Sequence, residues 1–228
     1  MPNEVQELVA TASRVIGNAG MGDLIWGHAS ARDPEGKGAW LKQAGWGLEE
    51  ITPELVQLVG PDGEVVAGAG PRHREYPIHT EIFRARPDVG GVVHVHSRYA
   101  VALAASGQPV LPVSHEGNYF QRGVPRFTET ADLILTPELG AAVAAVLNDA
   151  EGCFLVNHGI VTVGPDLPSA AVAAVILERA CEAQFLTKVF GGWPTWSGPD
   201  ESRAKHHNIY ESSKHAVFDY LVRGLPSV

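Results

Sequence analysis

The sequence is poor in cysteine and in basic residues, and it has no long apolar run. Cys153 and Cys181 are its two cysteines, and neither belongs to a CxxC pattern. We therefore expect two buried thiols rather than a disulfide or a redox pair. No apolar stretch approaches the roughly 18–20 residues of a membrane span, and Met1–Ala10 lacks a basic segment followed by an apolar one. These absences predict a cytoplasmic protein that has no membrane partner.

The shortage of positive charge also bears on the choice of partner. The chain has 17 Lys and Arg against 26 Asp and Glu, which gives a formal net charge of −9. Because nucleic acid binding needs an excess of basic side chains on one face, this balance disfavours a nucleic acid partner. With 228 residues, 45% hydrophobic and 19% charged, the chain can bury a sizeable core within one large domain.

Local patterns predict helices and short strands that alternate along one chain, without an internal repeat. Apolar spacing and stop signals predict helices over Glu4–Ile16, Glu75–Arg86, Tyr99–Ala105, Pro137–Leu147, Ser169–Val189 and about Asp200–Val222. Short β-prone runs predict a strand then a loop in Asp23–Arg32, a hairpin of Leu55–Val59 and Glu64–Ala67, and strands over Val92–His96, Cys153–Val156 and Ile160–Val163. A loop from Gly191 to Gly198 precedes the last helix. The alternation predicts a single α/β domain over residues 1–228.

The ten histidines carry the chemical signal, and three of them are placed to converge. His94 and His96 stand two apart in a predicted strand, so their side chains leave the same face about 6–7 Å apart. His158 lies in a tight Asn-His-Gly turn between two apolar strands. Each alone could be an ordinary buried histidine. Together they supply the three neutral nitrogen ligands that suit Zn²⁺ or a neighbouring divalent metal, with a position left open for substrate.

Glu75 begins the helix that leads into the strand of His94. A carboxylate at this place could be a fourth metal ligand at rest, or a general acid/base once substrate displaces it. The alternative interpretation is a helix N-terminal glutamate that the helix dipole favours by some tenths of a kcal/mol.

The segments EYPIHTEIFRARPDVGGVVHVHS and VNHGIVTVG, which contain Glu75, His94, His96 and His158, resemble the class II aldolase/adducin family. The resemblance runs from the opening helix to about Val189. It implies a three-layer α/β/α fold with a central, largely antiparallel sheet. It further implies a homotetramer with active sites between subunits, a divalent metal held by the three histidines, and a glutamate that handles protons. Zn²⁺ is the first expectation, with Mn²⁺, Co²⁺ or Fe²⁺ as alternatives.

The chain departs from the sugar-phosphate members of this family at the residues that cradle a phosphate. Those members carry a Gly-Asn-x-Ser loop and a Ser-Ser pair before the glutamate. Here the first loop reads Gly-His-Ala-Ser, with His28 and Ser30, and Arg72-His73-Arg74 precedes Glu75. Because a planar carboxylate is well matched by a guanidinium or an imidazole, we expect His28, Ser30, Arg72 and His73 to bind a carboxylate-bearing anion. A solvated basic loop with one buried histidine is the competing interpretation.

Further segments (WGHASAR, RHREYPIH, VSHEGNYF and PRF) resemble the decarboxylase branch of the family, in particular 3,4-dihydroxyphthalate decarboxylase-like proteins. His115 is then a second candidate for proton transfer, and Tyr119 a candidate for substrate binding. Trp26, Trp46 and Phe120 could line an aromatic pocket, although core packing is the commoner use of such residues.

Three hypotheses follow from the resemblance. The first is a metal-dependent carbon–carbon lyase that decarboxylates a dihydroxylated aromatic carboxylate such as 3,4-dihydroxyphthalate. The second is an aldolase or 4-epimerase that acts on a sugar phosphate, and the third is an adducin-like interaction module without a metal. The C-terminal helix is expected at a subunit interface, where Tyr210 or His206 could reach a neighbouring site.

Overall fold

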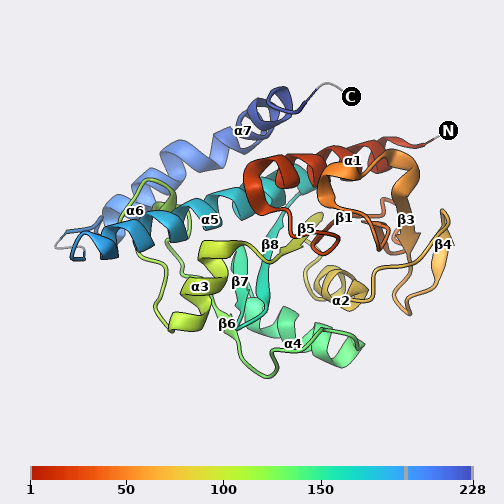
Figure 1. Cartoon of the computed structure of the whole chain (residues 1–228), viewed down its shortest axis with the longest axis horizontal. Helices are drawn as coiled ribbons and strands as arrows, with labels where there is room; N and C mark the ends of the chain where they lie inside the picture. The colour runs from red at the N-terminus through yellow and green to blue at the C-terminus, as the bar shows by residue number, and fades with distance from the viewer. Residues whose placement is uncertain (1, 193–194, 227–228) are drawn as a thin grey trace.

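A sheet of eight strands forms the middle layer of the computed structural model, which describes residues 2–192 and 195–226 (Figure 1). The strands occur in the spatial order β4-β3-β2-β1-β5-β8-β7-β6, and every neighbouring pair is antiparallel except β6 and β7. Their bounds are β1 His28–Arg32, β2 Ala39–Lys42, β3 Val56–Val59, β4 Val65–Ala67, β5 Gly91–Val95, β6 Arg126–Phe127, β7 Gly152–Leu155 and β8 Gly159–Gly164. The fold is therefore α/β with a largely antiparallel central sheet, as expected.

Helices cover both faces of this sheet, as Figure 1 shows. The α-helices are α1 Glu4–Ile16, α2 Tyr76–Ala85, α3 Arg98–Ser106, α4 Pro137–Leu147, α5 Leu167–Val189, α6 Pro199–Lys205 and α7 Glu211–Arg223. Buried apolar residues of α1, α3, α5 and α7 form one core cluster with one face of the sheet, and those of α2 and α4 form a second cluster with the other face. The two clusters give a three-layer architecture.

Strand alternation decides which side chains meet the second layer. On β1, Ala29 and Ala31 join the α1/α5 core, so His28 and Ser30 point to the α2 side. The register pairs His28 directly with His94 of β5. The chain thus sets two imidazoles side by side on the face that α2 covers.

Most predicted elements are confirmed, with small shifts at their ends. In Asp23–Arg32 the predicted order of strand then loop is wrong, because an irregular segment comes first and strand β1 follows it at His28–Arg32. The hairpin of β3 and β4 is present and antiparallel, and β5 ends at Val95 rather than at His96. The sequence patterns missed β2 and the two-residue β6. Residues His206–Tyr210 form a π-helical turn inside the predicted last helix. Residues 193 and 194 of the predicted Gly191–Gly198 loop lie outside the described residues.

No helix among the described residues is long and apolar enough to cross a membrane. Cys153 and Cys181 are both free and buried, as predicted. Burial raises the pKa of the Cys153 thiol to about 12, so this thiol is inert at neutral pH.

Candidate metal centre

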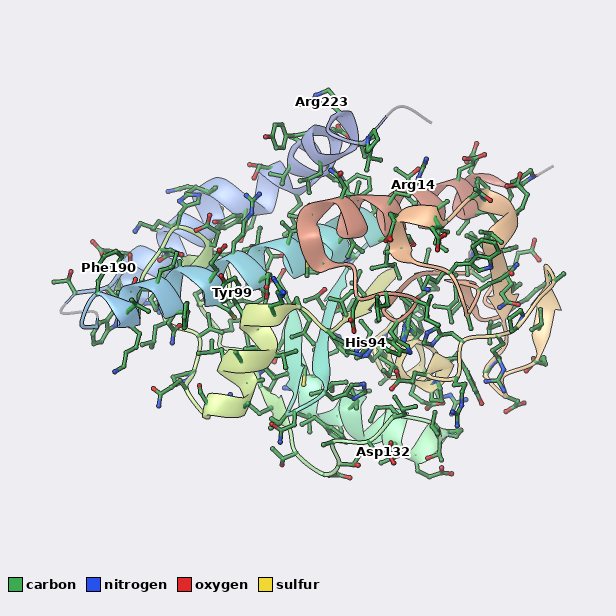
Figure 2. All side chains as sticks on the ribbon, viewed as in Figure 1. Arg14, His94, Tyr99, Asp132, Phe190 and Arg223 are labelled. Carbon is green, nitrogen blue, oxygen red and sulfur yellow. The ribbon has the colours of Figure 1, made fainter. Side chains whose placement is uncertain are left out.

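The three predicted histidines and the glutamate meet in space. One ligand atom from each of Glu75, His94, His96 and His158 lies within 4.8 Å of every other. His94 lies in β5, His96 directly follows that strand, and His158 lies in the turn between β7 and β8. Figure 2 places His94 at the centre of the molecule, between the helix layers. The antiparallel pairing of β5 with β8 is what brings the turn beside the first two histidines.

The hydrogen-bond partners of His94 and His96 fix where their protons lie. His94 Nδ1 donates to the carbonyl oxygen of Ile160 at 2.9 Å, since a carbonyl only accepts. His96 Nδ1 donates to the carboxylate of Asp23 at 2.8 Å. Both neutral rings therefore present an unprotonated Nε2, and these two nitrogens are 3.2 Å apart. Two lone pairs at this distance repel each other unless a cation lies between them.

A divalent metal ion fits this arrangement. With Zn–N bonds of about 2.0–2.1 Å and tetrahedral angles, two ligand nitrogens stand about 3.3 Å apart, close to the separation seen here. The third imidazole, that of His158, has both ring nitrogens buried, and neither has a hydrogen-bond partner in the part of the chain that the structure describes. Burial lowers the pKa of His158 to about 4, so the ring is neutral at pH 7 and able to ligate.

Glu75 stands next to this triad as the residue that caps α2. Its Oε1 is 3.5 Å from His158 Nε2, its Oε2 is 3.8 Å from His94 Nε2, and Oε1 also accepts the backbone N–H of Ile134 at 2.8 Å. Burial raises the pKa of Glu75 to about 7, and the bond from Ile134 opposes that rise only in part. The carboxyl can therefore hold or release a proton near neutral pH, which is what a general acid/base needs.

A second group of imidazoles lies directly beside the first, since the ring centroids of His28 and His94 are 4.9 Å apart. His28 Nε2 is 3.8 Å from Glu75 Oε2, and the ring centroids of His28 and His73 are 3.8 Å apart. Both side chains are buried, and among residues 2–192 and 195–226 nothing forms a hydrogen bond with His28 Nε2 or His73 Nδ1. Burial lowers the pKa of His73 to about 3, so it is neutral at pH 7. Glu75 is thus close both to the three imidazoles of the candidate metal centre and to the adjacent imidazoles of His28 and His73.

Three residues of this region were missed by sequence reasoning. Asp23 is 73 positions from His96, so only the fold could pair them. His79 is buried on α2, four residues after Glu75, and this helical spacing was a usable signal. Lys42 of β2 is buried and donates to the carbonyls of Ile25 and Trp46, but no local pattern marks it.

The predicted substrate-binding residues Ser30, Arg72 and His73 differ in the partners that they contact. Ser30 is buried, and its Oγ is 2.6 Å from His79 Nδ1. The guanidinium of Arg72 stacks on the ring of Tyr76, 4.3 Å from its centroid. His73 joins His28, as expected, whereas Arg74 is exposed.

The structure does not bring His115 and Tyr119 to Glu75 within one chain. Tyr119 donates to Glu151, which precedes β7, whereas His158 follows that strand. The backbone carbonyl of His115 accepts from Tyr210, and the His115 side chain is exposed. The proposed catalytic role of His115 therefore stays a prediction that would require a second copy of the chain.

The aromatic residues considered for a substrate pocket divide between surface and core. Trp26 and Trp46 are about half exposed, whereas Phe120 is buried against Tyr119. His206 faces Glu151 in the same cluster as Tyr119.

Gly159 is required by the close approach of β8 to the ligand histidines. A Cβ at this position would lie 2.8 Å from His96 Cδ2, 2.8 Å from the Val95 carbonyl oxygen and 2.9 Å from His94 Cε1. We expect Gly159→Ala to displace the rings and to weaken Zn²⁺ affinity at least about 10-fold, as loss of ligand orientation does. Competition with a chromogenic chelator measures this. Gly198→Ala, where an added Cβ meets nothing within 4 Å, is the control; equal affinity in both variants would contradict the expectation.

Asp23 orients His96 and makes its Nε2 a better ligand. We expect Asp23→Asn to weaken Zn²⁺ binding by about 10-fold, because a neutral amide oxygen still accepts the Nδ1 proton but no longer adds charge. The same chelator competition reads the change. The exposed turn residue Asp62 gives the matched control, Asp62→Asn, for which no change is expected. An unchanged affinity in Asp23→Asn would mean that the pair with His96 only shapes the loop.

The family described as Class II Aldolase and Adducin N-terminal domain matches residues 7–185 of the chain. This protein belongs to the class II aldolase/adducin family. Enzymes of this superfamily use a divalent metal, and the His/Glu cluster described above could bind one.

Three curated relatives are similar at about the same level. The Meiotically up-regulated gene 14 protein of Schizosaccharomyces pombe is 30% identical over 78% of this chain and 70% of its own length. A 4-hydroxy-3-prenylphenylpyruvate oxygenase/4-hydroxy-3-prenylbenzoate synthase of Streptomyces roseochromogenus subsp. oscitans is 32% identical over 75% of this chain. Decarboxylase NovR of Streptomyces niveus is 31% identical over 74% of it. The match spans only 62% and 64% of the two Streptomyces proteins.

The fold also matches solved structures. The L-fuculose 1-phosphate aldolase from Glaciozyma antarctica PI12 superposes with a TM-score of 0.86, covering 97% of this chain and 88% of the other. At 24% identity, this likeness confirms the predicted fold and leaves the substrate open.

Proposed function

We propose that this class II aldolase-family protein is a metal-dependent carboxy-lyase that decarboxylates a dihydroxylated aromatic carboxylate, with 3,4-dihydroxyphthalate as the first candidate. The observation that carries the proposal is the pair of buried imidazoles, His28 and His73, which lie next to Glu75 and, through His28, directly beside the metal triad. Imidazoles at this place suit a planar carboxylate, and they stand where the sugar-phosphate members resembled here carry the asparagine of the Gly-Asn-x-Ser loop and the Ser-Ser pair. The decarboxylase name of the Streptomyces niveus relative agrees with this proposal.

The residues divide the work between holding charge and moving a proton. A divalent metal, Zn²⁺ by preference, bound by His94, His96 and His158 would stabilise negative charge on substrate oxygens. His28 and His73 hold a carboxylate so that the scissile C–C bond faces the site. That bond breaks, CO₂ leaves, and the electron pair left on the ring is finally used to form a C–H bond with the proton of Glu75. In the metal-free protein, burial raises the pKa of Glu75 to about 7, which supports this role as a proton donor.

An aldolase or epimerase acting on a sugar phosphate is the second candidate. The fold likeness to an L-fuculose 1-phosphate aldolase favours it, because the same metal can stabilise the charge formed in retro-aldol cleavage. It requires that His28 and His73 accommodate a phosphate.

The test of the proposed function is a substrate panel with zinc-reconstituted protein. We expect CO₂ release from 3,4-dihydroxyphthalate or a related catechol carboxylate, and no release in a matched sample treated with chelator. Ketose phosphates run in parallel. Aldehyde formation or epimerisation from a ketose phosphate, without CO₂ release from the catechol carboxylates, would contradict the carboxy-lyase proposal and favour the second candidate.

We further propose that the chain assembles as a homotetramer with its active sites at subunit interfaces. Large apolar side chains at the end of α5 remain exposed, among them Phe185, Leu186, Val189 and Phe190. His115 and Tyr119, which lie apart from Glu75 in one chain, would then act on a neighbouring site. A monomeric mass for the active protein in solution would contradict this.

A further inference from the structure

Three buried side chains, Ser30, His79 and His28, are joined in that order by hydrogen bonds behind the site. Ser30 Oγ is 2.6 Å from His79 Nδ1, and His79 Nε2 is 2.5 Å from His28 Nδ1. All three residues have no exposed surface. The last atom of this hydrogen-bonded series, His28 Nε2, is buried, faces Glu75 and has no hydrogen-bond partner among the described residues. The positions of the protons in this series decide whether His28 Nε2 presents a hydrogen or a lone pair to a ligand.

Two proton arrangements are possible for neutral rings. In the first, Ser30 donates to His79, His79 donates to His28 Nδ1, and His28 carries its hydrogen on Nε2. In the second, every bond is reversed, so His28 Nε2 is a bare lone pair and the Ser30 hydroxyl needs another acceptor. Within residues 2–192 and 195–226, no acceptor other than His79 bonds to Ser30 Oγ. Because a buried hydroxyl without an acceptor is unfavourable, the first arrangement is preferred.

The charges around His28 favour the same arrangement. An Nε2–H attracts the Glu75 carboxylate 3.8 Å away, whereas a lone pair would repel it. Burial lowers the pKa of Lys42 to about 8, which leaves this buried amine mostly protonated at pH 7. After burial itself, the charge of Lys42 is the largest influence that lowers the pKa of His73. A neighbouring positive charge favours an anion beside His28 and His73 and disfavours a cation there.

We propose that Ser30 and His79 are positioning residues that keep the hydrogen of His28 on Nε2, so that His28 donates it to an anionic oxygen of the substrate. His28, His73 and Glu75 also have the residue types of a second metal site, with one ligand atom from each within 4.8 Å of the others. The proton order excludes that use, because a metal ligand needs a lone pair on the facing nitrogen. The inference rests on the proposed function for the identity of the anion, a carboxylate.

The first measurement is the ¹⁵N NMR spectrum of the histidine side chains in the zinc-loaded protein. It reports which ring nitrogen of His28 carries hydrogen, without any need for turnover. We expect the Nε2–H tautomer at His28 and one zinc ion per chain. An Nδ1–H tautomer at His28, or a second tightly bound zinc ion that is lost in His28→Ala, would overturn the inference.

The second measurement is the affinity of the zinc-loaded protein for phthalate, a dicarboxylate without the hydroxyl groups. His79→Leu and Ser30→Ala are expected to weaken phthalate binding about 10-fold, the effect of losing one well-placed donor to an anion. His79→Gln is expected to retain affinity within about 3-fold, since its amide can donate to His28 Nδ1 in place of the ring. Zinc affinity should be unchanged in all three variants, because none of these side chains touches the triad.

The variants separate positioning from mere packing. Equal phthalate affinity in His79→Leu and His79→Gln would overturn the proposal, even if both fold. If His79→Leu fails to fold, Ser30→Ala and the wild-type tautomer still decide. Absence of CO₂ release from the wild-type protein would refute the proposed function, whereas the tautomer and the phthalate affinities would still decide this inference.

Discussion

Replacing His94 with alanine is expected to abolish tight metal binding and turnover together. His94 is fully buried, and its Nδ1–H donates to the carbonyl oxygen of Ile160. Its unprotonated Nε2 therefore faces the other histidines of the cluster. Without it, the metal keeps two imidazoles, one of them from an irregular turn. Because a metal contributes several kcal/mol of charge stabilisation, we expect activity to fall on the order of 10³-fold or more. Metal content after dialysis and the rate of CO₂ release measure the two effects.

A second substitution at this position separates ligation from packing. In His94→Asn, the amide can still donate to Ile160, yet it cannot reach the position of Nε2. We expect the same loss of metal with a smaller loss of stability. His207→Ala is the control, since His207 is exposed and its one bond among the described residues is to Glu211 on the last helix. Retention of one metal per chain in both His94 variants would refute the ligand assignment.

Glu75→Gln is expected to leave the metal bound and to remove most of the turnover. The amide oxygen can still accept the backbone N–H of Ile134, so the local structure is kept, but no proton can be delivered from this position. Loss of a general acid costs about 10²–10⁴-fold in rate. Turnover and metal content, measured on the same sample, check the prediction. A variant with unchanged turnover would show that another group supplies the proton.

The same variant is expected to stabilise the metal-free protein at alkaline pH. The folded-state pKa of Glu75, about 7, lies above its ordinary value of 4.5. Its contribution to stability is therefore fully present below about pH 4.5 and is lost as the pH rises through 7. At pH 8 the wild type bears a cost of about 3 kcal/mol that the neutral amide avoids, which corresponds to a melting temperature about 5–10 °C higher for the variant. Thermal melts in chelator at pH 5 and pH 8 test this; equal differences at both would contradict it.

The clustering of His94, His96 and His158 could be predicted from the sequence because local structure does most of the positioning. Two histidines two apart on a buried strand must share a face, and a tight turn between apolar strands aims the third. The place of Glu75 at the start of a helix next to that strand made it a candidate, and the family resemblance then singled it out from an ordinary helix N-terminal glutamate. The fold was predictable for the same reason, except for β2 and β6. β2 includes a buried lysine and does not alternate in polarity, and β6 has only two residues.

Residues that act through tertiary contacts could not be found in this way. Asp23 meets His96 only because the loop before β1 passes beside the end of β5. His79 looks like any histidine on an amphipathic helix until the sheet places Ser30 and His28 against it. For His115 and Tyr119 the fold of one chain separates what the family resemblance had joined, since Tyr119 bonds to Glu151 at the opposite end of β7 from His158.

Titration of metal-free protein with zinc, while CO₂ release from 3,4-dihydroxyphthalate is recorded, tests the central claim most directly. We expect no release without zinc, a linear rise as zinc is added, and saturation at one equivalent per chain. Release that persists in chelator, a requirement for two equivalents, or no release at any zinc concentration would contradict a carboxy-lyase that works through a single metal held by His94, His96 and His158.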